Sequence, residues 1–443
     1  MAKSGVVHIV HHVDTEGPLH EPLSGTFSRI EQLFGITIDA PRTRESLQQM
    51  RSGKLLGEDT SVIEGVKKLL DPRLMSLYST WEEIDAMLRV ITSSRFRGEL
   101  PDSFGGGWIF NWHVLCQAGF ETNETGKDLG YLKIFNHYEA LLKETGSLQD
   151  RIHWHFHPIS FFREAHISAT SYENSYPELH QVLCRRLIDK KWFPVVNRAG
   201  FHTERPDSNW FLEQWMPFDA SNQALSGARE VQGDAVHGRF GDWSGAPDDW
   251  SIYHPDLYDW RKKGALNRSV ARALNLNARM RNITEDELEK AFKAAADGAH
   301  VYVGITNHDF RDMAREIRDF REMLRAVSGK FPSVQYKFSE AVEAFRAVLG
   351  YAGEEKLEFG CTIAGNVLTV TREKGEFFGP QPYLAIKTKD GRYFHDNFDF
   401  GEFKQTYFYT FDRYTIPLEK VETVAVASND KYGNTAIKFI SSS

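Results

Sequence analysis

The sequence predicts an α/β fold followed by an all-β domain, and two observations carry this prediction. Up to about residue 350, short β-branched runs alternate with segments whose apolar residues recur at helical spacing. Such alternation is typical of βαβ units and implies a parallel sheet, either a barrel or a doubly wound sheet. Beyond residue 350, β-branched and aromatic runs follow one another at roughly ten-residue intervals, the pattern of a β-sandwich. We therefore expect one domain over residues 1–350 and a sandwich over 351–443.

Local signals mark the elements of the first domain. Thr80 and Glu83 have capping-box spacing and start a helix expected over residues 80–92. Trp108-Ile109-Phe110 is interpreted as the second strand. The stretch from about 18 to 105 is too long for one crossover and is interpreted as an insertion near the ligand-binding end of the sheet. The other expected elements are a helix over 131–144, a helix capped by Thr284 and Glu287, a helix over about 310–328, a strand over Val334–Phe338 and a helix from Ser339 to about Leu349.

The second domain is expected to consist of strands separated by turns. Turn signals such as Ala364-Gly365-Asn366 and Lys389-Asp390-Gly391 divide the runs. The runs are Leu357–Ile363, Val367–Thr371, Tyr383–Thr388, Thr406–Phe411, Val421–Ala427 and Ala436–Ile440. Sugar binding, homo-oligomer formation and covering of the first domain are all roles open to such a sandwich.

Composition excludes several classes of protein. The 443 residues are 41% hydrophobic and 26% charged, which is ordinary for a globular chain. A formal net charge of -8 gives no indication of nucleic-acid binding. No apolar run approaches the length of a membrane span, and no charged-then-apolar signal segment precedes the first strand. The three cysteines lack metal-type spacing, so we expect reduced thiols and a cytoplasmic protein.

Three histidines stand close together on one predicted strand. His153, His155 and His157 alternate with apolar residues and end at Pro158. Neutral imidazole is the commonest metal ligand, so a metal site is the first hypothesis. In a straight strand His153 and His157 would lie about 13 Å apart, too far to share one ion. Either the chain bends after His153, or the nearer pair His155 and His157 supplies the ligands; a strand whose histidines only form hydrogen bonds is the simpler alternative.

Two acids end the first predicted strand. Its apolar run breaks at Gly17-Pro18, so Asp14 and Glu16 lie two residues apart at its carboxyl end and face the same way. Ligands bind at that end of parallel α/β sheets. One carboxylate can bind a metal ion while the other accepts a proton. An ordinary acidic turn is the alternative.

These residues are part of a wider pattern, in which the chain resembles the polysaccharide deacetylase (NodB-homology, carbohydrate esterase family 4) superfamily. Five short motifs occur in the family's order. They are His12-Val13-Asp14-Thr15-Glu16-Gly17, His153-Trp154-His155-Phe156-His157-Pro158, Arg198-Ala199-Gly200 with the later Phe218-Asp219-Ala220-Ser221, Trp250-Ser251-Ile252-Tyr253-His254-Pro255-Asp256, and Val301-Tyr302-Val303-Gly304-Ile305-Thr306-Asn307-His308-Asp309. Two positions depart from the family. The second acid is Glu16, and Trp154 replaces the usual Ser or Thr.

The resemblance implies a distorted (β/α)7 barrel of NodB type and a set of residue roles. One divalent metal ion, with Zn²⁺ as the default, would be held by Glu16, His153 and His157. The catalytic residues would be Asp14 as base, Arg198 as its ionic partner and His308 as general acid. The substrate wall would include Trp250, Tyr253, His254 and His202. The two departures leave the roles of Asp14 and Glu16 exchangeable and keep His155 as an alternative ligand.

The function implied by the resemblance is metal-dependent removal of an N-acyl group, acetyl or formyl, from an amino sugar. A chain expected in the cytoplasm would act on a small or carrier-linked sugar precursor during surface polysaccharide biosynthesis. Two other classes compete with this hypothesis. A glycoside hydrolase would use paired carboxylates on a similar barrel and would need no histidine cluster. A catalytically inactive homologue would bind sugars only.

Overall fold

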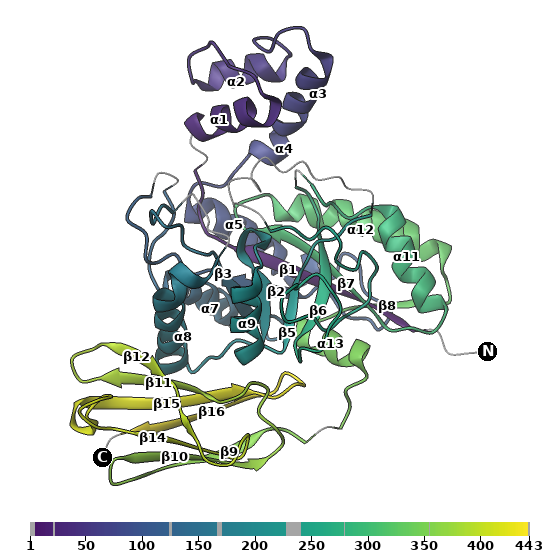
Figure 1. Cartoon of the computed structure of the whole chain (residues 1–443). Coiled ribbons are helices and arrows are strands. Elements are labelled where there is room, and N and C mark those ends of the chain that lie inside the picture. Colours follow the sequence, from purple (N-terminus) through teal and green to yellow (C-terminus); the bar gives the residue numbers. More distant parts are fainter. Residues whose placement is uncertain are drawn as a thin grey trace.

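The computed structural model describes residues 5–20, 23–123, 126–165, 171–226, 241–278, 280–353 and 355–441. Figure 1 shows three tiers: a small group of helices at the top, a barrel with surrounding helices in the middle, and layered strands at the bottom.

Seven parallel strands close into a barrel because β1 pairs with β2 on one side and with β7 on the other. The strands are β1 (Val6–Thr15), β2 (Phe110–Val114), β3 (Arg151–Phe156), β4 (Val196–Ala199), β5 (Phe218–Asn222), β6 (Ser269–Asn275) and β7 (Val301–His308). An eighth strand, β8 (Gln335–Phe338), pairs with the first half of β1. The second half of the same edge of β1 pairs with β2. The predicted parallel sheet is therefore confirmed, in its barrel form.

Helices follow the strands and cover the outside of the barrel. They are α5 (Trp81–Ile91), α6 (Ser94–Arg97), α7 (Lys133–Thr145), α8 (Tyr176–Lys190), α9 (Pro206–Trp215), α11 (Glu285–Ala296), α12 (Met313–Lys330) and α13 (Ala341–Leu349), with short 3₁₀ turns η1 (Glu173–Ser175) and η2 (Gly200–His202). A third 3₁₀ turn, η3 (Leu418–Lys420), precedes β15 in the C-terminal part. No helix in the described ranges has the length and hydrophobicity that crossing a bilayer requires.

Local capping decides where several of these helices begin. The Thr80 side chain accepts a hydrogen bond from the Glu83 N–H, and Glu83 reaches back to the Thr80 N–H, which confirms the predicted capping box. Thr284 caps α11 as expected. The helix expected from residue 310 begins at Met313 instead, because Asp312 is its N-cap. The second strand likewise begins at Phe110, two residues later than expected.

The predicted insertion is a helical subdomain between β1 and α5. It contains α1 (Leu23–Phe34), α2 (Arg44–Arg51), α3 (Thr60–Leu69) and α4 (Pro72–Met75). Its apolar residues pack on one another in a cluster of their own, which comprises Phe27, Ile30, Ile38, Met50, Leu56, Val62, Val66, Leu69 and Leu70. In Figure 1 the subdomain stands beyond the carboxyl end of β1. The long crossover thus becomes a separate small core above that end of the barrel.

Two antiparallel sheets of four strands each make up the C-terminal part. One holds β9 (Glu358–Ala364), β10 (Val367–Lys374), β13 (Asp399–Phe400) and β14 (Thr406–Thr410), and the other β11 (Tyr383–Thr388), β12 (Tyr393–Asp396), β15 (Val421–Asn429) and β16 (Thr435–Ser441). Side chains of both sheets meet in one apolar core, consistent with the predicted sandwich. All six predicted runs fall on strands, whereas the short β12 and β13 were not predicted.

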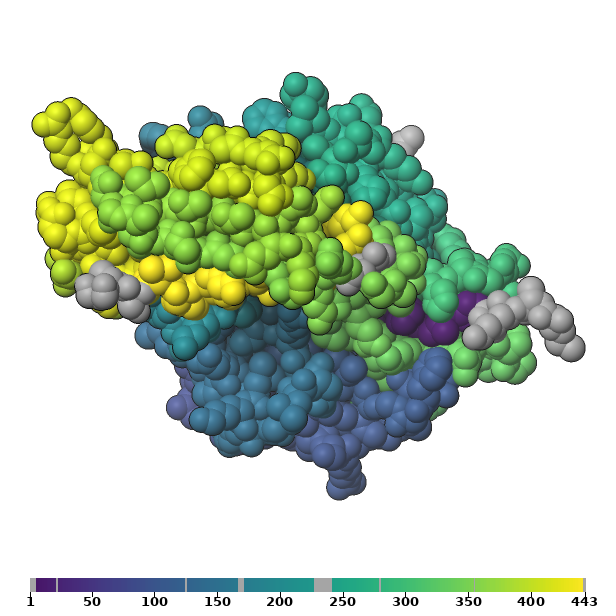
Figure 2. Space-filling view, turned by 90° about the horizontal axis from the view of Figure 1, so that it is seen from below, coloured from purple at the N-terminus to yellow at the C-terminus, as the bar shows by residue number. Residues whose placement is uncertain are grey.

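The second of these sheets packs tightly on the barrel's helices. His395 of β12 stacks on both Tyr383 of β11 and His180 of α8, with ring centroids 4.2 and 4.1 Å away. The buried amide of Asn429 donates to the carbonyl oxygens of Pro194 and Trp215, at 2.6 and 2.8 Å. Figure 2, seen from below, shows the C-terminal strands spread across this side of the molecule. Removing them would expose apolar surface of α8 and α9.

The Asn429→Ala substitution tests the importance of this contact. It leaves two buried carbonyl oxygens without a donor, so we expect the free energy of unfolding to fall by about 2–4 kcal/mol. Urea denaturation measures the loss. The control is Asn136→Ala, at an exposed position of α7, which should change stability by less than about 0.5 kcal/mol. Equal effects of the two substitutions would show that Asn429 does not hold the sheets to the barrel.

Candidate active site

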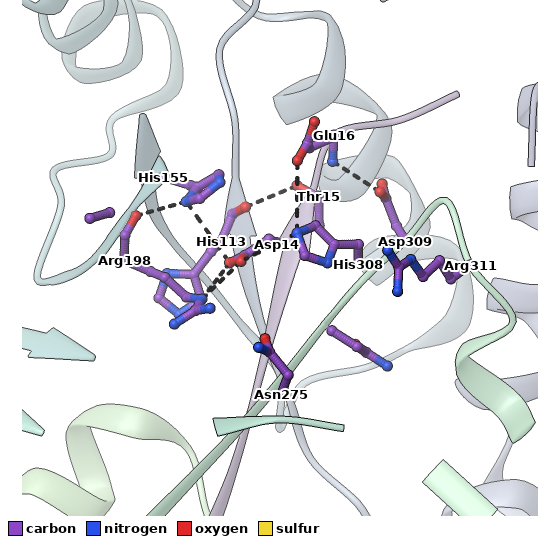
Figure 3. A network of polar contacts seen from close by, with 12 residues as sticks. Asp14, Thr15, Glu16, His113, His155, Arg198, Asn275, His308, Asp309 and Arg311 are labelled. Carbon is purple, nitrogen blue, oxygen red and sulfur yellow. Dashed lines mark hydrogen bonds and ion pairs between the residues drawn. The ribbon is translucent and has the colours of Figure 1, made fainter. Parts of the chain in front are cut away.

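The carboxyl ends of four barrel strands bring six polar side chains together. Asp14 lies on β1 in register with His308 at the end of β7. The other members of the group are Glu16 just after β1, His155 on β3, His157 just after β3, and Arg198 on β4. All except His308, which is partly exposed, are buried. Figure 3 shows His155, Arg198, Asp14, His308 and Glu16 turned toward one another. The structure thus brings together Asp14, Glu16, His157, Arg198 and His308 from the expected site, with His155, the alternative ligand, beside them.

A buried ion pair crosses the barrel at the centre of this group. Arg198 Nε lies 2.7 and 2.9 Å from the two carboxylate oxygens of Asp14. The same guanidinium donates to the carbonyl oxygen of Ala220 on β5, at 3.0 Å. Charge-assisted hydrogen bonds of this kind fix geometry strongly. The Asp14 carboxylate is therefore held in one orientation, as the predicted pairing requires.

The imidazoles of His155 and His157 converge on each other. Their Nε2 atoms lie 3.1 Å apart. His155 Nδ1 lies 2.7 Å from the carbonyl oxygen of Arg198, so Nδ1 carries the proton and Nε2 presents its lone pair. Two nitrogens bound to one tetrahedral ion at about 2.0–2.1 Å would be about 3.3 Å apart. The pair thus has the spacing of two ligands of one metal ion, with an outer hydrogen bond that fixes the tautomer.

Glu16 is placed between these imidazoles, His308 and a lysine. One carboxylate oxygen, Oε1, lies 3.8 Å from His157 Nε2 and 3.9 Å from His308 Nε2. The other, Oε2, accepts a hydrogen bond from Lys127 Nζ at 3.2 Å. Burial acts to raise the pKa of Glu16, but the Lys127 charge and the nearby imidazoles outweigh it and lower that pKa. Glu16 is accordingly an anion at neutral pH.

His308 faces both acids of the group. Its Nε2 lies 3.9 Å from Asp14 Oδ2 and 3.9 Å from Glu16 Oε1. Burial lowers the pKa of His308 to about 3, against the opposing effect of Glu16. The imidazole is therefore neutral at neutral pH before any reaction begins, and it must gain a proton before it can act as an acid.

His153 is not brought into this group. Its Nε2 lies 3.0 Å from Glu340 Oε1 and 3.2 Å from Asn111 Oδ1. β3 continues as a strand from Arg151 to Phe156, without the bend that a joint role for His153 and His157 would need. Of the two arrangements left open by the sequence, the structure therefore shows the nearer pair, His155 and His157.

The four residues expected on the substrate wall have different surroundings. Trp250 and Tyr253 are buried, and each donates to a backbone carbonyl: Trp250 to that of Glu287 and Tyr253 to that of Trp260. His254 is exposed, and its Nδ1 lies 3.0 Å from the Arg268 carbonyl oxygen. His202 follows Arg198 by four residues, and burial first, then the Arg198 charge, lowers its pKa well below the usual value. Only His202 has an electrostatic contact with the central group.

Two residues that the sequence analysis did not select support the site directly. The Asp309 carboxylate accepts from the backbone N–H groups of Glu16 and Gly17 and from the Tyr138 hydroxyl, at 2.8–3.0 Å. It thereby fixes the turn that carries Glu16. Its position immediately after His308 was the available signal. Lys127, the partner of Glu16, lies in an irregular loop, and no local pattern marks it.

Gly200 allows His157 to reach the site. A methyl group at residue 200 would overlap the His157 ring and the carbonyl oxygen of Phe156. The next residue, Phe201, has a left-handed backbone, with φ of 51°, and packs its ring 4.2 Å from that of His157. Such strain in a non-glycine residue is typical of functional sites. The backbone after β4 is thus shaped around the imidazole.

Comparisons with known proteins identify no relative of this chain. No protein-family model, no curated protein and no solved structure matches it. What the site does must therefore be argued from its residues.

The Gly200→Ala substitution tests the close approach of His157. We expect overlap with the imidazole to lower the free energy of unfolding by about 1–3 kcal/mol. The control is Gly329→Ala near the end of α12, where a methyl group meets nothing within 4 Å. That change should leave stability unchanged or raise it by up to about 1 kcal/mol. Thermal unfolding of both variants provides the measurement, and a neutral result at residue 200 would contradict the proposed fit.

Proposed function

We propose that this protein is a metal-dependent hydrolase that removes an N-acyl group from an amino sugar or carrier-linked sugar precursor. One observation carries the proposal. Residues from four of the five motifs that resemble those of polysaccharide deacetylases, far apart in sequence, meet at the carboxyl end of one parallel barrel. There an anchored carboxylate, a second carboxylate and two converging imidazoles share one buried site.

The residues fit one divalent ion held by His155, His157 and Glu16. Among the described residues no three such groups already close on a common point, and Glu16 is paired with Lys127 instead. The Nε2 atoms of the two imidazoles nevertheless face each other, and Glu16 Oε1 lies 3.8 Å from that of His157. Zn²⁺ is the first candidate for imidazole and carboxylate ligands. A bound divalent ion would acidify a water molecule and polarise the acyl carbonyl.

The protein's own groups supply the proton transfers. Asp14, held by Arg198, is the anchored base for the proton of the attacking water. His308 Nε2 lies 3.9 Å from Asp14 Oδ2, so a proton accepted by Asp14 has a short route to the neutral imidazole. From there it can pass to the departing amine as the C–N bond breaks. This order of events reconciles the general-acid role of His308 with its low pKa.

Metal content distinguishes the ligands of the proposed ion. His155→Ala and His157→Ala should each weaken Zn²⁺ binding by more than about 100-fold. Loss of a residue that only hydrogen-bonds to a metal ligand typically weakens binding by roughly 10–100-fold, and loss of a ligand itself should cost more. His153→Ala should leave Zn²⁺ affinity unchanged, because its ring faces Glu340 instead. Calorimetric titration of the metal-stripped protein measures the affinities. Loss of binding in His153→Ala with full binding in His155→Ala would favour a bent strand, contrary to this structure.

Substitution of the acids tests the chemistry. Asp14→Asn should retain bound metal and lower the rate of N-acyl sugar hydrolysis by about 10²–10⁴-fold, because the base is lost. Glu16→Gln should weaken metal binding. His308→Ala is the comparison variant, because it leaves the Asp14–Arg198 pair intact. It should lower the rate of hydrolysis by a similar factor without lowering thermal stability.

Two outcomes would contradict the proposal. If Asp14→Asn empties the metal site while Glu16→Gln only slows turnover, the two acids have exchanged roles. If hydrolysis of a sugar substrate continues unchanged after chelation, the metal-dependent assignment is lost and a glycoside hydrolase becomes the better hypothesis.

A further inference from the structure

A second candidate site lies between the helical subdomain and the loop that leads out of the active site. It is a cavity of about 450 Å³. Its walls come from the loop after β1, from one side of α2 and from the segment that leads from α3 to α5. Its principal lining residues are Leu19, His20, Arg44, Gln48, Arg51 and Met75.

The cavity combines positive charge with an apolar surface. Arg44 and Arg51 lie seven residues apart on α2, so both point to one side of that helix, about 10 Å apart along its axis. Within the described ranges neither arginine has an ion-pair or hydrogen-bond partner for its side chain, whereas nearby Arg42 is paired with Glu31. None of the described residues that line the cavity is acidic, and leucine and methionine side chains form part of its surface.

Two loops connect the cavity to the active site. His20 follows Glu16 by four residues, so at most about 14 Å of extended chain separates them. The Leu19 N–H donates to the Tyr78 carbonyl oxygen, and the Tyr78 N–H donates to that of Phe310, two residues beyond His308. The cavity wall is therefore hydrogen-bonded to the loops that follow β1 and β7, beside Glu16 and His308.

We propose that this cavity binds a phosphate group with an attached apolar chain, as the part of the substrate remote from the acyl group. Two guanidinium groups that have no ion-pair partner among the described residues suit a phosphate, because their planar donors match its oxygens. The leucines and Met75 would cover the attached chain. The link to the substrate rests on the proposed function, but the chemistry of the ligand follows from the cavity alone.

The test is direct binding of octyl phosphate, measured by calorimetric titration. Arg44→Gln/Arg51→Gln should bind it at least about tenfold more weakly than the wild type, because two charge-assisted contacts are lost. The matched control, Lys54→Gln/Lys68→Gln, removes the same charge from the same subdomain but from residues that do not line the cavity. It should bind like the wild type.

Further probes complete the test. Octanol and inorganic phosphate should each bind more weakly than octyl phosphate, because each lacks half of the ligand. Arg44→Lys/Arg51→Lys, which keeps the charge but loses the planar donors, should recover only part of the affinity. An unchanged thermal unfolding midpoint of the Gln variant shows that its weaker binding is not misfolding. Equal affinity of the two Gln double variants, or tighter binding of octanoate than of octyl phosphate, would overturn the proposal.

The assay is independent of catalysis. Asp14→Asn should bind octyl phosphate normally even though turnover is lost. Normal binding of octyl phosphate by a protein that proves inactive on N-acyl sugars would refute the proposed function but would still support the proposed ligand of the cavity. Absence of binding by a protein that does hydrolyse such sugars would refute the cavity's role alone.

Discussion

The ion pair between Asp14 and Arg198 is the interaction on which the rest of the site depends. It joins β1 to β4 across the barrel, and the same arginine bonds β5 through the Ala220 carbonyl and β3 through His155. Both charges are buried, so removing one partner would leave the other uncompensated at a cost of roughly 3–5 kcal/mol. One arginine therefore aligns two site residues: its guanidinium holds the base Asp14, and its backbone carbonyl oxygen holds the candidate metal ligand His155.

The two-residue period of a strand explains which histidines share the site. His153 and His155 lie on the same side of β3, but they differ by about 6.6 Å along it. That displacement takes His153 to Glu340 at the start of α13, whereas His155 stays level with Arg198. His157 lies beyond the end of the strand, where Gly200 leaves room for its ring to turn back. A straight strand and one glycine thus decide the pairing.

Burial gives the site its electrostatic character. It keeps His308 neutral, while Lys127 keeps Glu16 anionic despite the same burial. The helical subdomain above contributes a cavity whose two arginines have no ion-pair partner in the described part of the chain. Its wall is hydrogen-bonded to the loops that follow β1 and β7. Chemistry and recognition of the remote part of a substrate would then be divided between the barrel and its insertion.

The sequence by itself determined the order of strands and helices, the change to antiparallel strands after residue 350, and the grouping of Asp14, Glu16, Arg198 and His308. The first two follow from local periodicity, capping and turn residues. The grouping of the four site residues was implied by the resemblance to the deacetylase motifs, together with the rule that ligands bind at the carboxyl ends of parallel strands. Only the tertiary structure decided that the sheet closes, that His155 replaces His153 beside His157, and that Lys127 and Asp309 hold Glu16. Those contacts join residues more than a hundred positions apart or depend on side-chain direction, which local patterns do not encode.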